Sequence, residues 1–177
     1  MRIVSFCTLF QPSQKKFFNL PFLVIGGSSG STVYDAMVRY SVEDDTWKDM
    51  PCMTEKRCWC AASVLNGKIY VCGGSDTNIY HGKVHTPACF LDSVECFDPK
   101  TSAWTLVKPM KMKRFHVALV AGPNTLYAIG GSDVPSMEVY HEATDEWEFL
   151  PLPDNFPLRG AGAVALPMPV DELLNRA

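Results

Sequence analysis

A motif of two glycines, an aromatic residue and a tryptophan occurs three times in this chain of 177 residues. The glycines end an apolar run in each case, and the tryptophan follows the aromatic residue by seven positions: Tyr40 and Trp47, Phe97 and Trp104, Tyr140 and Trp147. A unit of about 50 residues that cannot bury its own apolar face must stack on its neighbours. The repeat therefore predicts a modular fold.

The units consist of short apolar segments, and helical periodicity is weak. Asn66-Gly67 is a strong hairpin-turn signal between two such segments. The predicted strands of the second and third units are Cys60–Leu65, Lys68–Cys72, Ser93–Phe97, Ser102–Val107, Phe115–Val120, Leu126–Ile129, Ser136–Tyr140 and Glu146–Leu150. Repeated four-stranded antiparallel units are typical of propeller blades, so we expect an all-β propeller fold.

Two runs of the second unit, residues 65–74 and 91–104, resemble the kelch repeat. The second run is especially similar to the kelch-like family, whose members join BTB, BACK and kelch domains. The resemblance covers about residues 20–169 and implies a partial propeller, the last three blades of a six-bladed ring. It implies units at about 20–56, 57–113 and 114–158, a closing strand at 159–167, a non-repeat segment at 1–19 and a C-terminal tail at 170–177.

The first unit departs from the family because no kelch-type first strand precedes it. The segment Arg159–Leu166 resembles the strand with which family members close the ring on their first blade. Ile3–Phe10 is an alternative surrogate first strand, although the polar residues that follow suit it poorly. A shortened or alternatively started product explains this organisation most simply, and two copies completing a ring of three plus three blades is an alternative.

An up-and-down strand order places the loops between strands two and three at the same end as the links between units. The resemblance implies that this end recruits the partner. The candidate partner-binding residues there are Arg57, Cys58, Trp59, Ser75, Asp76, Arg114, Phe115, His116, Ser132, Asp133 and Arg159.

Several of these residues also have a structural interpretation. We expect the three arginines to hold loop carbonyls or a carboxylate, and the three repeat tryptophans to supply apolar contacts between blades. Trp59 and Phe115 would suit a partly apolar peptide if they are exposed. The alternative is that both pack inward on the first strand of their units.

The longest loop contains His81, His85 and Cys89 at spacings of four, which share one face of a helix. With Asp76 or Cys58 they would make four zinc ligands. A glycine and a proline within the segment oppose a helix, so we expect an ordinary exposed loop, no metal and no cofactor. A lowered pKa of the Cys58 thiol beside an arginine, giving an electrophile sensor, is a further alternative.

The composition restricts the partners and the compartment. A net charge of −3 argues against nucleic-acid and membrane partners, and no apolar run of about 20 residues suggests a membrane span. The seven cysteines are odd in number and follow no disulfide framework, which indicates a reducing, cytoplasmic compartment. The N-terminal apolar run is short and lacks a small-residue cleavage site, so we expect no secretion signal.

The kelch-like resemblance implies a protein-interaction module, the substrate-recognition propeller of an adaptor for a cullin-RING ubiquitin ligase. Cullin contact in that family requires a BTB domain, for which 177 residues leave no room. An actin- or cytoskeleton-associated kelch protein is the first alternative, and a kelch-fold metalloenzyme the second. Because the sequence contains no phosphate-binding loop, catalytic triad order or paired-carboxylate motif, we expect no enzyme activity.

Overall fold

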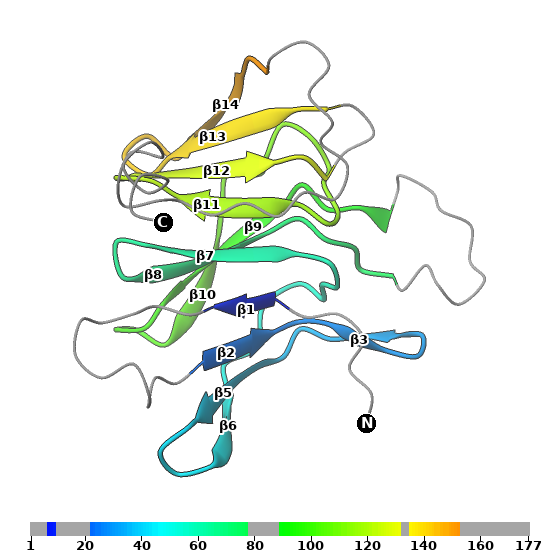
Figure 1. The fold of residues 1–177 in the computed structure, drawn as a ribbon, viewed down its shortest axis with the longest axis vertical. Helices are drawn as coiled ribbons and strands as arrows, with labels where there is room; N and C mark the ends of the chain where they lie inside the picture. The colour runs from blue at the N-terminus through cyan, green and yellow to red at the C-terminus, as the bar shows by residue number, and fades with distance from the viewer. Residues whose placement is uncertain (1–6, 10–21, 78–88, 132–134, 153–177) are drawn as a thin grey trace, which may run out of the picture.

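The computed structural model describes residues 7–9, 22–77, 89–131 and 135–152, and it shows three four-stranded antiparallel sheets stacked on one another (Figure 1). We name them blades 1, 2 and 3. Blade 1 contains β1 (Cys7–Leu9), β2 (Phe22–Ile25), β5 (Met37–Ser41) and β6 (Thr46–Met50). Blade 2 contains β7 (Ala61–Leu65), β8 (Lys68–Cys72), β9 (Val94–Asp98) and β10 (Ala103–Val107). Blade 3 contains β11 (Ala118–Ala121), β12 (Thr125–Ile129), β13 (Met137–His141) and β14 (Glu146–Leu150).

This architecture confirms the expected all-β fold of propeller blades. The innermost strands β1, β7 and β11 lie side by side, and the strands of each blade follow outward in chain order. A short hairpin of β3 (Ser28–Ser29) and β4 (Thr32–Val33), which the sequence analysis did not predict, extends from the loop between β2 and β5.

The predicted strands agree with the observed ones closely, with one exception. The predicted bounds Lys68–Cys72 and Glu146–Leu150 are those of β8 and β14, whereas β11 starts at Ala118 and not at the predicted Phe115. Cys7–Leu9 pairs with β2, so the surrogate first strand in the N-terminal segment is confirmed. The predicted closing strand at 159–167 lies outside the described residues.

Apolar residues on both faces of blade 2 form the core. Ile69 and Val71 belong to a cluster with residues of blade 1, whereas Tyr70 and Cys72 belong to a cluster with residues of blade 3. Successive side chains of a strand point to opposite faces of the sheet, so a strand that is apolar throughout suits a sheet covered on both sides. Blade 2 is therefore packed between its two neighbours.

The repeat tryptophans join consecutive blades. Trp104 Nε1 of blade 2 donates a hydrogen bond to the Pro51 carbonyl of blade 1 at 2.8 Å, and Trp147 Nε1 of blade 3 donates to the Lys108 carbonyl of blade 2 at 2.9 Å. Trp147 is only 3% exposed. Trp47 of blade 1 is 58% exposed, because no described blade precedes it. Among the described residues, the expected contact between blades is thus observed for Trp104 and Trp147 and not for Trp47.

The glycine pairs lie directly against the chain segment that links their blade to the next one, and this contact requires glycine. Gly73 has a φ of +62°, and a Cβ placed on it would lie 2.5 Å from the Arg114 carbonyl oxygen. The same carbonyl accepts a hydrogen bond from the Gly74 amide at 2.7 Å. The repeat requires glycine here because the backbone is left-handed and a second chain segment passes against it.

Candidate functional site

The links between blades are held by a buried arginine. Arg57 is fully buried and donates from Nε and Nη2 to one carboxylate oxygen of Glu95 on β9, at 3.3 and 3.0 Å. Its Nη1 donates to the carbonyls of Gly73 and Ser93, at 3.1 Å each. The Glu95 carboxylate also accepts the amides of the link residues Thr54 and Glu55. The link is therefore tied to blade 2 at several points.

Arg114 repeats this arrangement in blade 3. It is fully buried, and its Nε and Nη2 donate to Glu138 on β13 at 3.2 and 2.9 Å. Its Nη1 donates to the carbonyls of Gly130 and Ser136. The two arginines therefore hold both loop carbonyls and a carboxylate, as expected from the sequence.

The two arginine clusters differ in charge. Glu55 forms a second ion pair with Arg57 at 2.8 Å, while the corresponding link position before Arg114 is Met112. Within the described residues Arg114 pairs with Glu138 alone. In blades 2 and 3 the glutamate stands two positions before the repeat aromatic, and blade 1 has Val38 at that position.

The links and the loops between strands two and three meet at one end of the blades, which we call the loop end. The Cys58 amide donates to the Ser75 carbonyl at 2.9 Å, and the Ser75 amide returns a bond to Cys58 at 2.8 Å. The His116 amide of blade 3 donates to the Trp59 carbonyl of blade 2 at 2.9 Å. Backbone bonds therefore fix the loop end both within blade 2 and between blades 2 and 3.

Trp59 and His116 both have left-handed backbones, with φ of 55° and 54°. Such a conformation is uncommon for a residue with a side chain, and it persists only where the surroundings impose it. It explains why the extended strand in blade 3 cannot begin at Phe115. The residues after each repeat arginine belong to the link, and the strand begins beyond them.

Four rings gather at the loop end and form what we call the loop-end aromatic cluster: Trp59, Phe90, Phe115 and His116. The rings of Phe90 and Phe115 are stacked with centroids 4.0 Å apart and an interplanar angle of 16°. His116 lies 5.4 Å from both Trp59 and Phe115. Trp59 and Phe90 are buried, Phe115 is half-buried and His116 is exposed. The cluster presents an aromatic surface whose accessible part is contributed by Phe115 and His116.

Burial dominates the titration of the groups at this end. It raises the pKa of the Cys58 thiol to about 11, with a smaller contribution from the negative charge of Asp76. Burial also lowers the pKa of His116, which favours the neutral ring. The alternative of a Cys58 thiol with a lowered pKa is wrong, because burial raises the pKa of this thiol.

The structure separates the predicted partner-binding residues by accessibility. Arg57, Cys58, Trp59, Ser75 and Arg114 are buried, so they shape the loop end from beneath instead of presenting side chains to a partner. Trp59 packs inward, which was the alternative interpretation.

Three predicted residues remain accessible in whole or in part. Asp76 is exposed, Phe115 is half-buried and His116 contributes to the surface of the aromatic cluster. Ser132, Asp133 and Arg159 lie outside the described residues. Phe90, Glu95 and Glu138 were missed, although both glutamates stand two positions before the repeat aromatic and were visible as a pattern.

Two further expectations concerned metal ligands and membrane-spanning segments. Across residues 7–9, 22–77, 89–131 and 135–152, no three histidine, cysteine or acidic side chains are grouped as metal ligands. His81 and His85 of the proposed zinc loop fall outside these ranges. In the same ranges no helix has the length and apolar character needed to cross a bilayer.

The chain matches the family model for the Kelch motif over residues 56–111 and 113–151. Kelch-like protein 28 of Homo sapiens is 34% identical over 110 residues, a match that covers 62% of this chain and 19% of that protein. A kelch repeat and BTB domain-containing protein of Caenorhabditis elegans is 27% identical over 153 residues, covering 81% of this chain and 24% of that protein. The chain thus spans about a fifth of the length of these curated relatives.

A likeness to a solved structure concerns the fold alone. The structure of YjhT superposes with a TM-score of 0.67 at 18% sequence identity, covering 88% of this chain and 53% of that chain. The matched region of this chain includes most of its length, so the stacked blades are arranged as in a known structure.

Proposed function

Because this chain belongs to the kelch-repeat family and is a kelch-like protein, we propose that its loop end recognises a protein partner as the substrate-recognition part of an adaptor for a cullin-RING ubiquitin ligase. The observation that carries the proposal is the stacked Phe90–Phe115 pair with His116 beside it. An aromatic surface on a rigid base is what a protein-binding hot spot requires. The buried arginine clusters supply that rigidity.

The chemistry of the surface favours a partner segment with an apolar or aromatic side chain. Such a side chain would pack on the accessible part of Phe115, and Asp76 adds an exposed carboxylate at the same end. The proposal assigns ligase delivery to a BTB domain supplied by a longer protein, which the name of the Caenorhabditis elegans relative supports. It also places the protein in the cytoplasm, consistent with the free thiols of Cys52, Cys58 and Cys96.

Proximity labelling in cells, with Phe115→Ala compared with the parent chain, tests the recognition site. Partners that depend on the aromatic cluster should be lost with Phe115→Ala and kept with the control Phe149→Ala. Phe149 is a matched control because it is also a phenylalanine of blade 3, 51% exposed, but on the outer strand β14. A partner set unchanged by Phe115→Ala would contradict the proposed site.

A second experiment separates the ligase role from simple binding. Fused to a BTB domain, the parent chain should direct ubiquitination of the recovered partner, and the Phe115→Ala fusion should not. Binding without ubiquitination would refute the adaptor role. Co-sedimentation with actin filaments that requires Phe115 would favour the cytoskeletal alternative.

A further inference from the structure

The outer strands of blades 2 and 3 each expose a large apolar side chain at an equivalent position. Leu106 on β10 is 57% exposed, and Phe149 on β14 is 51% exposed. Leu106 pairs with Glu95 and Phe149 pairs with Glu138, the carboxylates that hold the two repeat arginines. Directly opposed residues of two paired strands share one face of the sheet, so each apolar side chain faces the preceding blade. Both side chains therefore lie at junctions between two described blades.

The link that enters a blade passes beside this apolar side chain. At the junction between blades 2 and 3, the amides of Lys111 and Met112 donate to the two carboxylate oxygens of Glu138, at 2.6 and 3.2 Å. The residue opposite Glu138 on the outer strand is Phe149. Lys111 is exposed and Met112 is half-buried. The shared carboxylate thus brings this part of the link next to Phe149 at the outer rim of the junction.

Two lysines of the link give this junction a positive charge. Lys111 and Lys113 are both exposed, and among the described residues neither is paired with a carboxylate. The buried Arg114 is balanced by Glu138, with 2.9 Å between Nη2 and the carboxylate oxygen. The charges of the two lysines are therefore the excess. Pro109 of the same link is also exposed and adds apolar surface.

The acidic residues of β14 do not cancel this charge. Glu146 pairs with Lys108, with 3.4 Å between Nζ and the carboxylate oxygen. The Glu148 carboxylate lies 3.0 Å from Nε2 of His141. Successive side chains of a strand point to opposite faces, so Glu148 lies on the face opposite to Phe149. The rim beside Phe149 is consequently apolar and basic.

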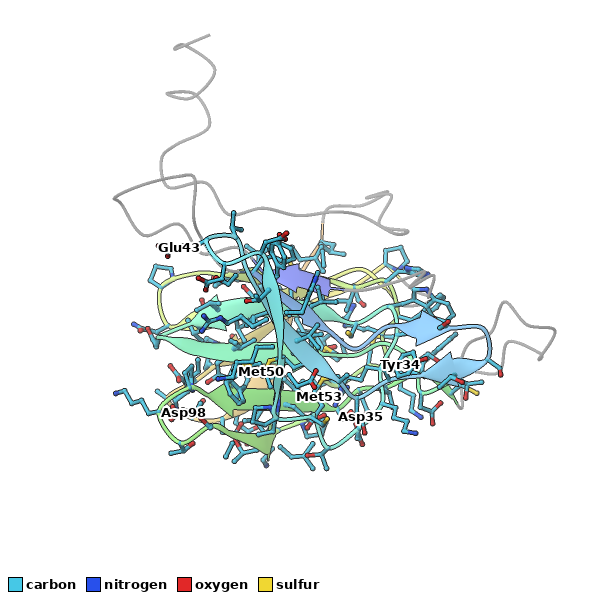
Figure 2. All side chains as sticks on the ribbon, turned by 90° about the horizontal axis from the view of Figure 1, so that it is seen from below. Tyr34, Asp35, Glu43, Met50, Met53 and Asp98 are labelled. Atoms are coloured by element: carbon cyan, nitrogen blue, oxygen red, sulfur yellow. The ribbon has the colours of Figure 1, made fainter. Side chains whose placement is uncertain are left out.

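The equivalent junction between blades 1 and 2 is built in the same way but has a different charge. Its link starts after Met50, the last residue of β6, and passes Met53, both labelled in Figure 2. The residues at the positions equivalent to 111–113 are Thr54, Glu55 and Lys56. The carboxylate of Glu55 offsets the single lysine, so this rim has no excess positive charge. The two junctions therefore differ in the partner that each could attract.

We propose that the rim of the junction between blades 2 and 3 binds a partner protein through a segment that carries carboxylates next to an apolar side chain. The apolar side chain packs on Phe149, which supplies the aromatic anchor of the contact. The carboxylates pair with Lys111 and Lys113, and this charge complementarity selects acidic segments over basic ones. The site lies on the outermost strand of blade 3, whereas Phe115 of the loop-end aromatic cluster precedes the innermost strand β11. It is therefore separate from the site proposed above.

Selection from a phage-displayed library of random peptides on the immobilised full chain tests the proposal. Phage that bind the Phe149→Ala variant are removed first, so that binders of other surfaces are discarded. The peptides that remain should be net acidic and contain an aromatic or large aliphatic residue. Fluorescence anisotropy then measures their affinity. Phe149→Ala should weaken it by about 30-fold or more, as truncation of an interface hot spot does. The Lys111→Glu, Lys113→Glu double variant should weaken it by about tenfold or more, because like charges then face each other.

The neighbouring junction supplies matched controls, with circular dichroism used to verify the folding of each variant. Leu106→Ala and Lys56→Glu change the equivalent positions between blades 1 and 2 and should leave peptide binding unchanged. Phe115→Ala should also leave it unchanged, just as Phe149→Ala keeps the loop-end partners, so the two sites succeed or fail separately. The proposal would be overturned by a selection without acidic peptides, by binding insensitive to the lysine changes, or by an equal loss with Leu106→Ala or Phe115→Ala.

Discussion

The arginine clusters lead to a quantitative prediction about two glutamates at equivalent positions. Glu138→Gln keeps the shape of the side chain but removes the single carboxylate that pairs with the buried Arg114 in the described structure. Leaving a buried charge without its partner typically costs about 3–5 kcal/mol. Glu95→Gln removes the equivalent carboxylate from Arg57, but Glu55 remains paired with that guanidinium at 2.8 Å. We expect the second change to cost about 2 kcal/mol less than the first, because one counter-charge is retained.

Urea unfolding at neutral pH, followed by circular dichroism, measures both free energies of unfolding. The Glu55→Gln, Glu95→Gln double variant should approach the cost of Glu138→Gln, since it removes the retained charge. Conversely, Met112→Glu should relieve part of the cost of Glu138→Gln, because Met112 holds the link position that Glu55 holds in the other cluster. Equal costs for the two single variants, or costs below about 1 kcal/mol for both, would refute the idea that these carboxylates neutralise a buried charge.

Two further predictions concern the backbone and the thiols. Gly73→Ala should destabilise the chain by at least about 2 kcal/mol more than Gly67→Ala. Both glycines have positive φ, but only at Gly73 would the added Cβ meet the Arg114 carbonyl. Thermal or urea unfolding of the two variants measures the difference, and similar costs would show that backbone strain alone decides the loss of stability. At pH 8 the buried Cys58 thiol, with its pKa raised to about 11, stays protonated, so iodoacetamide should label the exposed Cys52 well before Cys58. Mass spectrometry of the labelled peptides gives the order of labelling. Rapid labelling of Cys58 in the folded chain would contradict its burial.

The sequence predicts most of the fold because the signals are local. Asn66-Gly67 is a hairpin turn with positive φ at both residues, and the strands on either side of it lie where the alternation and the turn place them. The glycine pairs likewise identify positions where only a residue without a Cβ fits. These features depend on a few neighbouring residues, which a single sequence displays in full.

Features that depend on neighbours in space were harder to predict. Trp47, Trp104 and Trp147 occupy the same motif position, yet Trp47 is exposed and Trp147 is buried, because burial depends on whether another blade lies against the ring. The glutamate partners of the repeat arginines are separated from them by 38 residues in one blade and 24 in the next, so no fixed spacing reveals the pairs. The left-handed conformation of His116 depends on a hydrogen bond to a different blade.

For the candidate site, the sequence identified the correct segments but not the accessible side chains. The links and loops that it placed at one end do meet there, through bonds such as the pair between Cys58 and Ser75. Which side chains face solvent follows from the packing of those segments. That packing buries Trp59 and leaves Phe115 half-buried, although both stand close behind a repeat arginine.

The junctions between blades also bear on how such a chain evolves by duplication. The Lys108 amide meets Asp145, whereas Pro51, which has no amide hydrogen, meets a blade with Ser102 at the corresponding position. The amide donor of Lys108 thus faces a carboxylate, whereas Pro51 does not, so blade 3 placed directly after blade 1 would set the Asp145 carboxylate opposite a proline. Although the blades look interchangeable, their order along the chain is encoded at the junctions, and shuffling them would require matched changes on both sides.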